Sequence, residues 1–342
     1  MSATAALAAL LLGAALLAAP KVGAVALWSR LRARWDRTLA EDALKHVLAW
    51  QHRDQLASLE SLAGTLRLAP RTALRLAARL QSSGWIEVGS AGIALTPSGE
   101  RRALQVVRAH RLWERHLSDD ANMPMDRLHQ AAERAEHTLT REELAKLDAH
   151  LGHPQHDPHG DPIPRADGQV TPLKAASLSE WPPGPPARIV HVEDEPHAVF
   201  RQILACGLRP ALVVRVLRRE PDAIVVEASG RRARIDPAVA ASIQVRPAGE
   251  GDLLPPEAVR LSDLAQGESA TVIELAPACQ GFTRRRMLDL GLTPGASVQA
   301  ALGNTFGDPR AFRVRGTTIA MRKEQTDQVW IRRAAAPREE NP

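Results

Sequence analysis

The chain has 342 residues, a formal net charge of +5 at neutral pH and a pI of about 9.8. This length leaves room for two to four domains, and the basic balance is compatible with contact to nucleic acid or to an anionic membrane. The chain contains only two cysteines, Cys206 and Cys279, far apart in the sequence. This cysteine usage excludes a disulfide-rich secreted scaffold and favours a reducing compartment.

An apolar, uncharged run covers residues 3–19; Lys21, more apolar residues up to Trp28, and arginines at positions 30, 32 and 34 follow it. Because about 20 apolar residues span a bilayer, the sequence predicts a transmembrane anchor over residues 1–28. The basic residues follow the apolar run, so the positive-inside rule places the C-terminal body in the cytoplasm. The expected localisation is the inner membrane, with a single span. A cleaved signal peptide is the alternative, although its basic n-region is missing.

Residues 29–100 are expected to form a winged helix-turn-helix domain. Helices are predicted over residues 41–50, 58–66 and 70–81, with an N-cap offered by Ser58 and a helix start at Pro70. Two strands, residues 85–88 and 93–95, surround a glycine-containing turn and form the wing. In this geometry the helix from Pro70 enters the DNA major groove. Its candidate DNA contacts are Arg71, Thr72, Arg75 and Arg79.

A predicted all-α domain, residues 101–165, contains most of a polar cluster. Helices are expected over residues 97–117, 125–138 and 141–151. At about 100° per residue, one arc of the second helix contains His129, Glu133, Glu136 and His137. His110 and Glu114 share a face of the first helix. Carboxylates and imidazoles on one face suit a divalent metal better than a core. The alternative is a solvated helix surface, the ordinary state of a single such pair.

The remaining sequence has a different pattern. Residues 152–164 are rich in Gly, Pro and His. His153, His156 and His159 are expected to have packing or turn roles, with opportunistic metal binding by exposed imidazoles as the alternative. Residues 166–186 read as a flexible linker. Short alternating strands follow, and Gly207-Leu208-Arg209-Pro210 recurs as Gly291-Leu292-Thr293-Pro294. The repeat predicts two small β-barrels, at residues 187–248 and 258–334. The expected fold class is therefore α+β multidomain.

Several segments resemble the diphtheria toxin repressor and manganese transport regulator family of metal-dependent repressors. They are Glu41-Asp42-Ala43-Leu44, the run from Val106 to Leu112, Glu133-Arg134-Ala135-Glu136-His137, and the loop from Gly152 to Pro164. Both predicted barrels resemble the FeoA domain, an SH3-like barrel. The C-terminal copy is the clearer one, through the run from Arg286 to Leu292 and Gly307-Asp308-Pro309. The resemblance covers nearly everything after residue 40.

The resemblance implies two metal sites. The primary site would comprise Asp42, Glu133, Glu136 and His137, and the ancillary site His110, Glu114 and His129. Oxygen and nitrogen ligands suit Mn(II) or Fe(II) as the cofactor. In the family the first barrel can lend ligands to the ancillary site, and Glu195 and His197 lie in about the right place. Lys45 stands where manganese-type members carry a second N-terminal carboxylate, which puts a two-manganese site in doubt.

These features predict a metal-dependent transcriptional regulator of metal-ion homeostasis, not an enzyme. Metal that bridges Asp42 to the later ligands would fix the orientation of the reading helix, and a homodimer would present two readers to a double-stranded operator. One alternative is a membrane-anchored sensor or adaptor that acts on a metal transporter without binding DNA. Others are a winged helix that has lost its operator and a metallohydrolase, for which no general base or nucleophile is visible.

Overall fold

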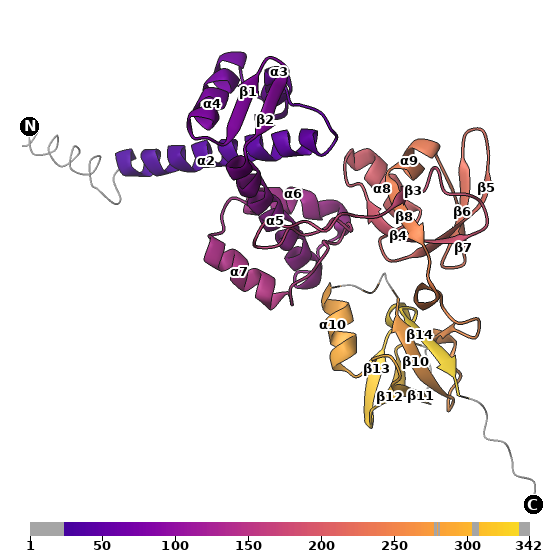
Figure 1. Cartoon of the computed structure of the whole chain (residues 1–342). Coiled ribbons are helices and arrows are strands. Elements are labelled where there is room, and N and C mark those ends of the chain that lie inside the picture. The colour runs from indigo at the N-terminus through magenta and orange to yellow at the C-terminus, as the bar shows by residue number, and fades with distance from the viewer. Residues whose placement is uncertain (1–23, 277–278, 280, 303–307, 335–342) are drawn as a thin grey trace, which may run out of the picture. The chain divides into compact units, whose positions relative to one another are not determined.

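The computed structural model describes residues 24–276, 279, 281–302 and 308–334 (Figure 1). The chain divides into two compact units. The first unit contains the described residues up to 110, with 133–145 and 164–170, and the second contains residues 111–132, 146–163 and those from 171 onward. Three of the divisions fall inside unbroken helices, α5 (Pro97–Asp119), α6 (Met125–Ala135) and α7 (Arg141–His150).

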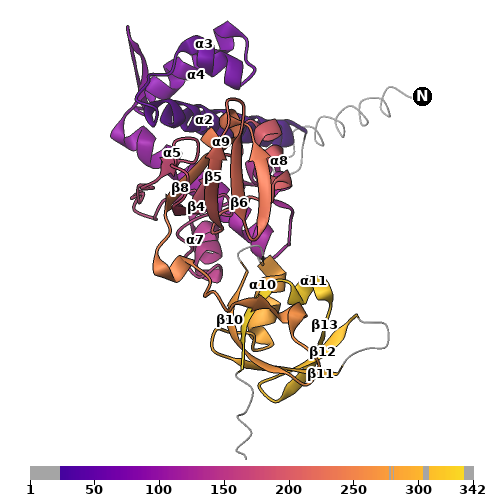
Figure 2. The ribbon, with the colours of Figure 1, turned by 90° about the vertical axis from the view of Figure 1, so that its right-hand side faces the viewer.

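The first unit contains the predicted winged helix-turn-helix. Its elements are α2 (Ala24–Gln51), α3 (Leu59–Thr65), α4 (Pro70–Ser82), β1 (Ile86–Gly89) and β2 (Gly92–Leu95). The backbone N–H of Ser61 donates to Ser58 Oγ at 3.0 Å, which confirms the predicted N-cap of α3. Leu44 and Val47 of α2 pack with Leu62 of α3 and Leu80 of α4 in one buried cluster. Figures 1 and 2 show α3, α4 and the hairpin on one side of α2.

Helices α5, α6 and α7 (Arg141–His150) correspond to the predicted all-α domain. The second of these helices is shorter than expected, because α6 ends at Ala135 and residues 136–138 form a turn. Glu136 and His137 therefore lie in that turn, and the predicted helical stripe from His129 to His137 is wrong for these two residues. Leu128 and Ala132 form the buried face of α6.

A six-stranded antiparallel sheet with two helices forms the first barrel, in the second unit. Its elements are β3 (Ala176–Ser177), β4 (Pro186–Val192), α8 (His197–Ala205), β5 (Val213–Arg219), β6 (Ile224–Ala228), β7 (Arg231–Ile235), α9 (Pro237–Ala241) and β8 (Ile243–Pro247). The strand order is β3-β8-β4-β5-β6-β7. Strand β3 lies in the predicted linker and pairs with β8, and Leu178 after it is fully buried in the barrel core. The end of the predicted linker is thus part of the first barrel.

The second barrel repeats this architecture (Figure 2). Its elements are β9 (Val259–Arg260), β10 (Ser269–Leu275), α10 (Gly281–Asp289), β11 (Ser297–Leu302), β12 (Arg310–Val314), β13 (Thr317–Met321), α11 (Lys323–Thr326) and β14 (Val329–Arg333). The order β9-β14-β10-β11-β12-β13 matches that of the first barrel strand for strand. Register shifts also recur, in β4 between Ile189 and His191 and in β10 between Val272 and Glu274. The internal repeat is therefore structural as well as sequential.

The expected membrane localisation is contradicted. Within the part of the chain that the structure describes, no helix is both long and apolar enough to cross a bilayer. Residues 24–28, which were expected to end the anchor, begin the long helix α2, and this helix continues through the charged sequence that includes Arg30, Arg32 and Asp36. Residues 1–23, which carry most of the predicted anchor, lie outside the described residues.

Candidate metal centre and nucleic-acid interface

Among the described residues, Asp42, Glu136 and His137 form a compact group of metal-ligand type, which we call the first group. One ligand atom from each lies within 4.8 Å of the others. His137 Nε2 lies 3.0 Å from Asp42 Oδ1 and 3.4 Å from Glu136 Oε1. Asp42 comes from α2, the helix that supports the winged domain, whereas Glu136 and His137 come from the turn after α6. The group thus joins two segments far apart in sequence.

Neighbouring charges tie the first group together. The side chain of Glu136 is only 1% exposed; Lys45 Nζ lies 3.1 and 3.0 Å from its two oxygens, and His110 Nδ1 contacts Oε2. Burial acts to raise the pKa of Glu136, but the hydrogen bond with His110 and the Lys45 charge leave that pKa below its usual value. His137 Nδ1 also bonds to Glu41 Oε2 at 2.7 Å. Burial opposes the charged imidazole, yet Asp42 and Glu41 raise the pKa of His137 to about 9.

The donor set of the first group fits a divalent cation. Two carboxylates and an imidazole are ligands that Mn(II) and Fe(II) accept. A cavity of about 350 Å³, lined by Glu41, Glu136 and His137 among others, reaches the group. Because metal ligands must be deprotonated, a cation at this site would displace the proton from His137. Glu133, the fourth expected ligand, lies on α6 with an exposed side chain, and the compact group does not include it.

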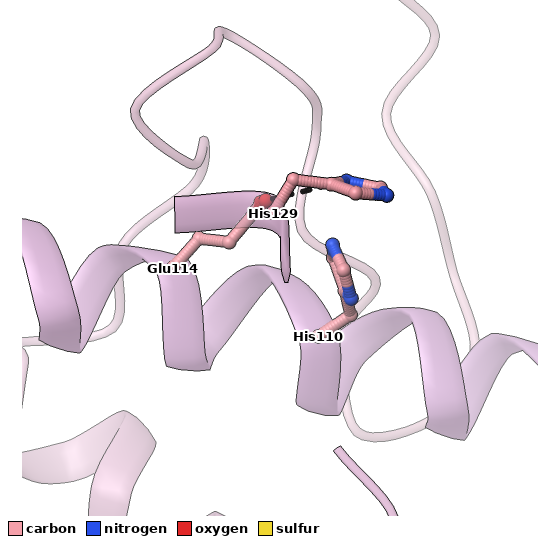
Figure 3. A group of neighbouring side chains, drawn as sticks. All are labelled: His110, Glu114 and His129. Carbon is pink, nitrogen blue, oxygen red and sulfur yellow. Dashed lines mark ion pairs between the residues drawn. The ribbon is translucent and has the colours of Figure 1, made fainter. Parts of the chain in front are cut away.

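The residues predicted for the ancillary site also come together. His110 and Glu114 lie one turn apart on α5, and His129 comes from α6. Ligand atoms of these three residues lie within 4.8 Å of one another. Figure 3 shows the His129 ring beside the carboxylate of Glu114, with His110 on the same side of α5. His129 Nδ1 lies 3.8 Å from Glu114 Oε1.

Two residues outside the predicted ligand set, His159 and Asp194, also lie in this region. Glu114 also groups with His159 and Asp194, within the second unit. His159 Nδ1 lies 3.6 Å from Glu114 Oε2, and His129 Nδ1 lies 2.8 Å from Asp194 Oδ2. We call Glu114, His129, His159 and Asp194 the second group. Of the two barrel ligands expected, Glu195 lies 3.6 Å from His129 Nε2 with a side chain 71% exposed, and His197 is exposed at the start of α8.

Folding of the histidine-rich loop against β4 creates the second group. The backbone N–H of Val192 donates to the carbonyl of His159 at 2.9 Å, and Asp194 follows at the end of that strand. Gly160 makes this approach possible, since its φ is +96° and an added Cβ would lie 1.9 Å from the Val190 carbonyl oxygen. Buried Asp157 accepts hydrogen bonds from the backbone N–H of His159 and Asp161, both at 2.9 Å. These contacts hold the buried side chain of His159 in place. The expected packing or turn role therefore does not describe this residue fully.

An unsatisfied atom indicates that the second group fits a cation. His159 Nε2 is buried and has no hydrogen-bond partner within the described structure. Unpartnered buried polar atoms are costly, and a metal ion is one way to satisfy an imidazole nitrogen. Burial lowers the pKa of His159, but the hydrogen bond with Glu114 and the surrounding carboxylates raise it overall to about 9. Two carboxylates and two imidazoles again form an oxygen and nitrogen donor set.

Helix α4, the predicted DNA-reading helix, has one buried and one exposed face. Ala73, Leu76, Ala77 and Leu80 are buried, while Arg71, Arg75 and Arg79 are exposed. Arg75 folds back and donates to the carbonyl of Arg71 at 3.3 Å and to Thr72 Oγ1 at 3.4 Å. Arg79 Nη1 lies 3.2 Å from Asp36 Oδ1 of α2. Arg75 and Arg79 thus each have a partner within the winged domain, and Arg71 is exposed near the start of α4.

Comparison with protein families matches most of the chain after residue 95. Residues 96–165 match the iron dependent repressor, metal binding and dimerisation domain, and residues 176–247 and 259–333 each match the FeoA domain. The first FeoA match begins at Ala176, where β3 begins, and so includes the end of the expected linker.

Comparison with individual proteins also finds metal-dependent repressors. The chain is 30% identical over 154 residues to the iron-dependent repressor IdeR of Mycobacterium leprae, which is 41% of this chain and 67% of that protein. A structure titled as a manganese-dependent transcriptional repressor complex with manganese matches with 32% identity and a TM-score of 0.56, covering 61% of this chain and all of that one. A 72-residue segment is 42% identical to a probable metal transport system membrane protein of Chlamydia trachomatis, over 21% of this chain and 16% of that protein.

These similarities extend from sequence to structure, and they agree with the expected α+β multidomain fold and with Mn(II) or Fe(II) as the cofactor. The matched repressor domain, residues 96–165, includes Glu114, His129, Glu136, His137 and His159 of the two groups. The chain belongs to the diphtheria toxin repressor family of iron- and manganese-dependent repressors.

Proposed function

We propose that this protein is a Mn(II)- or Fe(II)-dependent repressor that binds operator DNA through α4 and regulates genes of metal-ion homeostasis. One observation carries the proposal: the first group connects α2 to the turn after α6. Residues of α2 form a common core with α3 and α4, so the position of Asp42 is coupled to that of the reading helix. The relatives are named as repressors, which supports a non-enzymatic role.

Asp42, Glu136 and His137 would hold the cation of the first group. The bound ion supplies positive charge that offsets the repulsion between the two carboxylates. With these side chains drawn together, α2 is fixed relative to the turn at residues 136–138, and the orientation of α4 is fixed with it. Because the coupling is a free energy shared by two sites, operator DNA must raise metal affinity by the same factor as metal raises DNA affinity.

A homodimer is part of the proposal. Residues 96–165 match a domain described as metal binding and dimerisation. Two copies of α4 in a symmetric dimer would meet half-sites about one DNA turn apart, roughly 34–36 Å. The exposed Arg71 and Arg75 would then contact phosphates or guanine edges in each half-site.

Metal-dependent footprinting on the DNA upstream of the protein's own gene tests the proposal. The full chain should protect a two-fold symmetric site when Mn(II), or Fe(II) under anaerobic conditions, is present, and chelator should abolish the protection. His137→Ala is the matched variant, because it removes one ligand from an otherwise intact first group. Absence of protection at any metal concentration would contradict the proposal.

A second candidate function is an adaptor role without DNA binding. The similarity of a 72-residue segment to a probable metal transport system membrane protein favours an adaptor that reports metal status to a transporter. Such an adaptor would bind Mn(II) at the same groups but would not need α4. The salt dependence of DNA binding separates the two functions, since a phosphate-binding helix loses affinity steeply as salt rises.

A further inference from the structure

The carboxylate of Glu136 is approached from two sides by different groups. On one side, Oε1 lies 3.4 Å from His137 Nε2, which in turn lies 3.0 Å from Asp42. On the other side, Oε2 contacts His110 Nδ1. A buried carboxylate with an imidazole on each side has the donors for two cations, one at each oxygen.

The ammonium of Lys45 bridges the two oxygens of Glu136 and lies close to His110 on the second side. Its Nζ lies 3.0 Å from Oε2 and 3.1 Å from Oε1 of Glu136, and 3.5 Å from His110 Nδ1. Lys45 lies three residues after Asp42 on α2, so the helix presents both side chains on neighbouring positions of one face. The lysine side chain is 29% exposed, whereas that of Glu136 is 1% exposed, so the amine reaches inward to the carboxylate.

An ammonium at this position excludes a divalent cation for two reasons. It carries no lone pair, so it cannot act as a ligand. It also carries a positive charge within hydrogen-bond distance of the same oxygen and close to the same imidazole, and like charges at that separation repel strongly where water is scarce. The position beside Oε2 and His110 therefore already has a cation, attached covalently to α2.

We propose that Lys45 serves as the built-in second cation of the first group, so that this group binds one divalent ion and not a pair that shares Glu136. This inference rests on the proposed function, because it concerns the same metal site. It specifies the stoichiometry of that site and names Lys45 as the residue that sets it. Exchange of Lys45 for a carboxylate should convert the one-ion site into a two-ion site.

The test is a Mn(II) titration of the full chain that carries Glu114→Gln and His129→Ala. These changes remove two donors of the second group that also belong to the predicted ancillary site, so that the ions counted belong to the first group. Calorimetry or native mass spectrometry counts the ions, and electron paramagnetic resonance distinguishes an isolated Mn(II) from two ions coupled through one carboxylate. With Lys45 present, we expect one ion and an isolated-ion spectrum even in excess Mn(II).

Lys45→Glu in the same background is expected to bind a second ion and to give a coupled-pair spectrum. Lys45→Arg, which keeps the charge, is the matched control and should remain at one ion. The measurement on the Lys45 protein stands without either variant: a coupled pair there would overturn the proposal whether or not Lys45→Glu folds. A single isolated ion in a folded Lys45→Glu protein would also overturn it.

The same titration separates failure of this inference from failure of the proposed function. If the Lys45 protein binds no Mn(II) at all, the metal site itself is wrong and both proposals fall. If the Lys45 protein and its Lys45→Glu variant each bind one ion, and DNA binding still requires that ion, only the role of Lys45 is overturned.

Discussion

The two metal groups use the same kinds of donor, but the elements that supply the donors differ. The first group joins Asp42 of α2 to Glu136 and His137 in the turn after α6, and α2 shares its core with the reading helix. The second group joins Glu114 and His129 to His159 of a loop and Asp194 after β4. In the proposed function, metal at the first group would therefore act on the predicted DNA-reading helix, whereas metal at the second group would hold a loop against a barrel strand.

The two groups also differ in how their charged and polar atoms are paired. In the first group burial would raise the pKa of Glu136, but His110 and Lys45 hold that pKa below its usual value. In the second group His159 Nε2 has no partner within the described structure. Thus Lys45 and His110 offset part of the negative charge of Glu136 in the first group. The second group retains a buried imidazole nitrogen without a hydrogen-bond partner in the described structure.

The largest expected effect comes from Asp42→Ala. It should abolish Mn(II)-dependent DNA binding and weaken Mn(II) at the first group by more than the roughly 10–100-fold typical of an outer-shell partner. Glu133→Ala, on the exposed surface of α6, should have a smaller effect. Calorimetry and DNA-binding anisotropy on the same preparations check this. Unchanged DNA affinity of Asp42→Ala at low Mn(II) would contradict the role of the first group.

The sequence predicts the first group in part. The resemblance to the repressor family implies Asp42, and helical periodicity indicates Glu136 and His137, on a stripe that the structure ends at Ala135. A periodicity argument assumes that the helix continues, whereas ligand geometry here depends on the turn that follows it. Ser58, Pro70 and the glycine-containing turn did mark the winged domain, because capping and turn residues act locally.

The second group was harder to predict because its members meet through long-range folding. His159 and Asp194 lie 35 positions apart and are joined by the contact of Val192 with the loop. Glu195 and His197 lie close by in the sequence, but the direction of the chain after β4 turns Asp194 toward His129. One usable signal was Gly160 beside His159, since a glycine in a Pro-rich loop marks a close backbone approach.

The next effect is the loss of metal stabilisation in His159→Ala. An ion present at 100 times its dissociation constant stabilises the folded chain by about 2.7 kcal/mol, and the variant should lose most of this contribution from the second group. Urea denaturation with and without Mn(II) measures it. DNA binding at saturating Mn(II) should change little, in contrast to Asp42→Ala. A variant that loses DNA binding but keeps full stabilisation by Mn(II) would reverse the assignment of the two groups.

Substitutions in α4 test the reader that the first group is proposed to control. Arg71→Ala should cost roughly 1–3 kcal/mol on the correct operator if the residue contacts guanine, or lower the salt slope by about one if it contacts phosphate. Arg79→Ala should cost less, because Arg79 is paired with Asp36 at 3.2 Å. Titrations at several salt concentrations distinguish these results. Parent-like binding by Arg71→Ala with Arg75→Ala would favour the adaptor function.

The smallest expected effect is a dependence of the folding stability of the metal-free chain on pH. Burial acts to lower the pKa values of His137 and His159, but Asp42 and Glu41 in the first case and Glu114 in the second raise them from 6.5 to about 9. A raised histidine pKa stabilises the fold fully below pH 6.5, and this stability is lost as pH rises through 9. Denaturation midpoints in chelator should therefore fall across this pH range. His137→Ala and His159→Ala should each flatten the slope; a flat parent profile would contradict the ion pairs.

The central claim is that metal at the first group and DNA at α4 are coupled. The most direct measurement is the Mn(II) affinity of the full chain in the presence and absence of its operator. The predicted result is that operator tightens Mn(II) binding by the same factor as Mn(II) tightens operator binding, and that Asp42→Ala loses this factor while His159→Ala keeps it. Equal Mn(II) affinity with and without operator would contradict the claim.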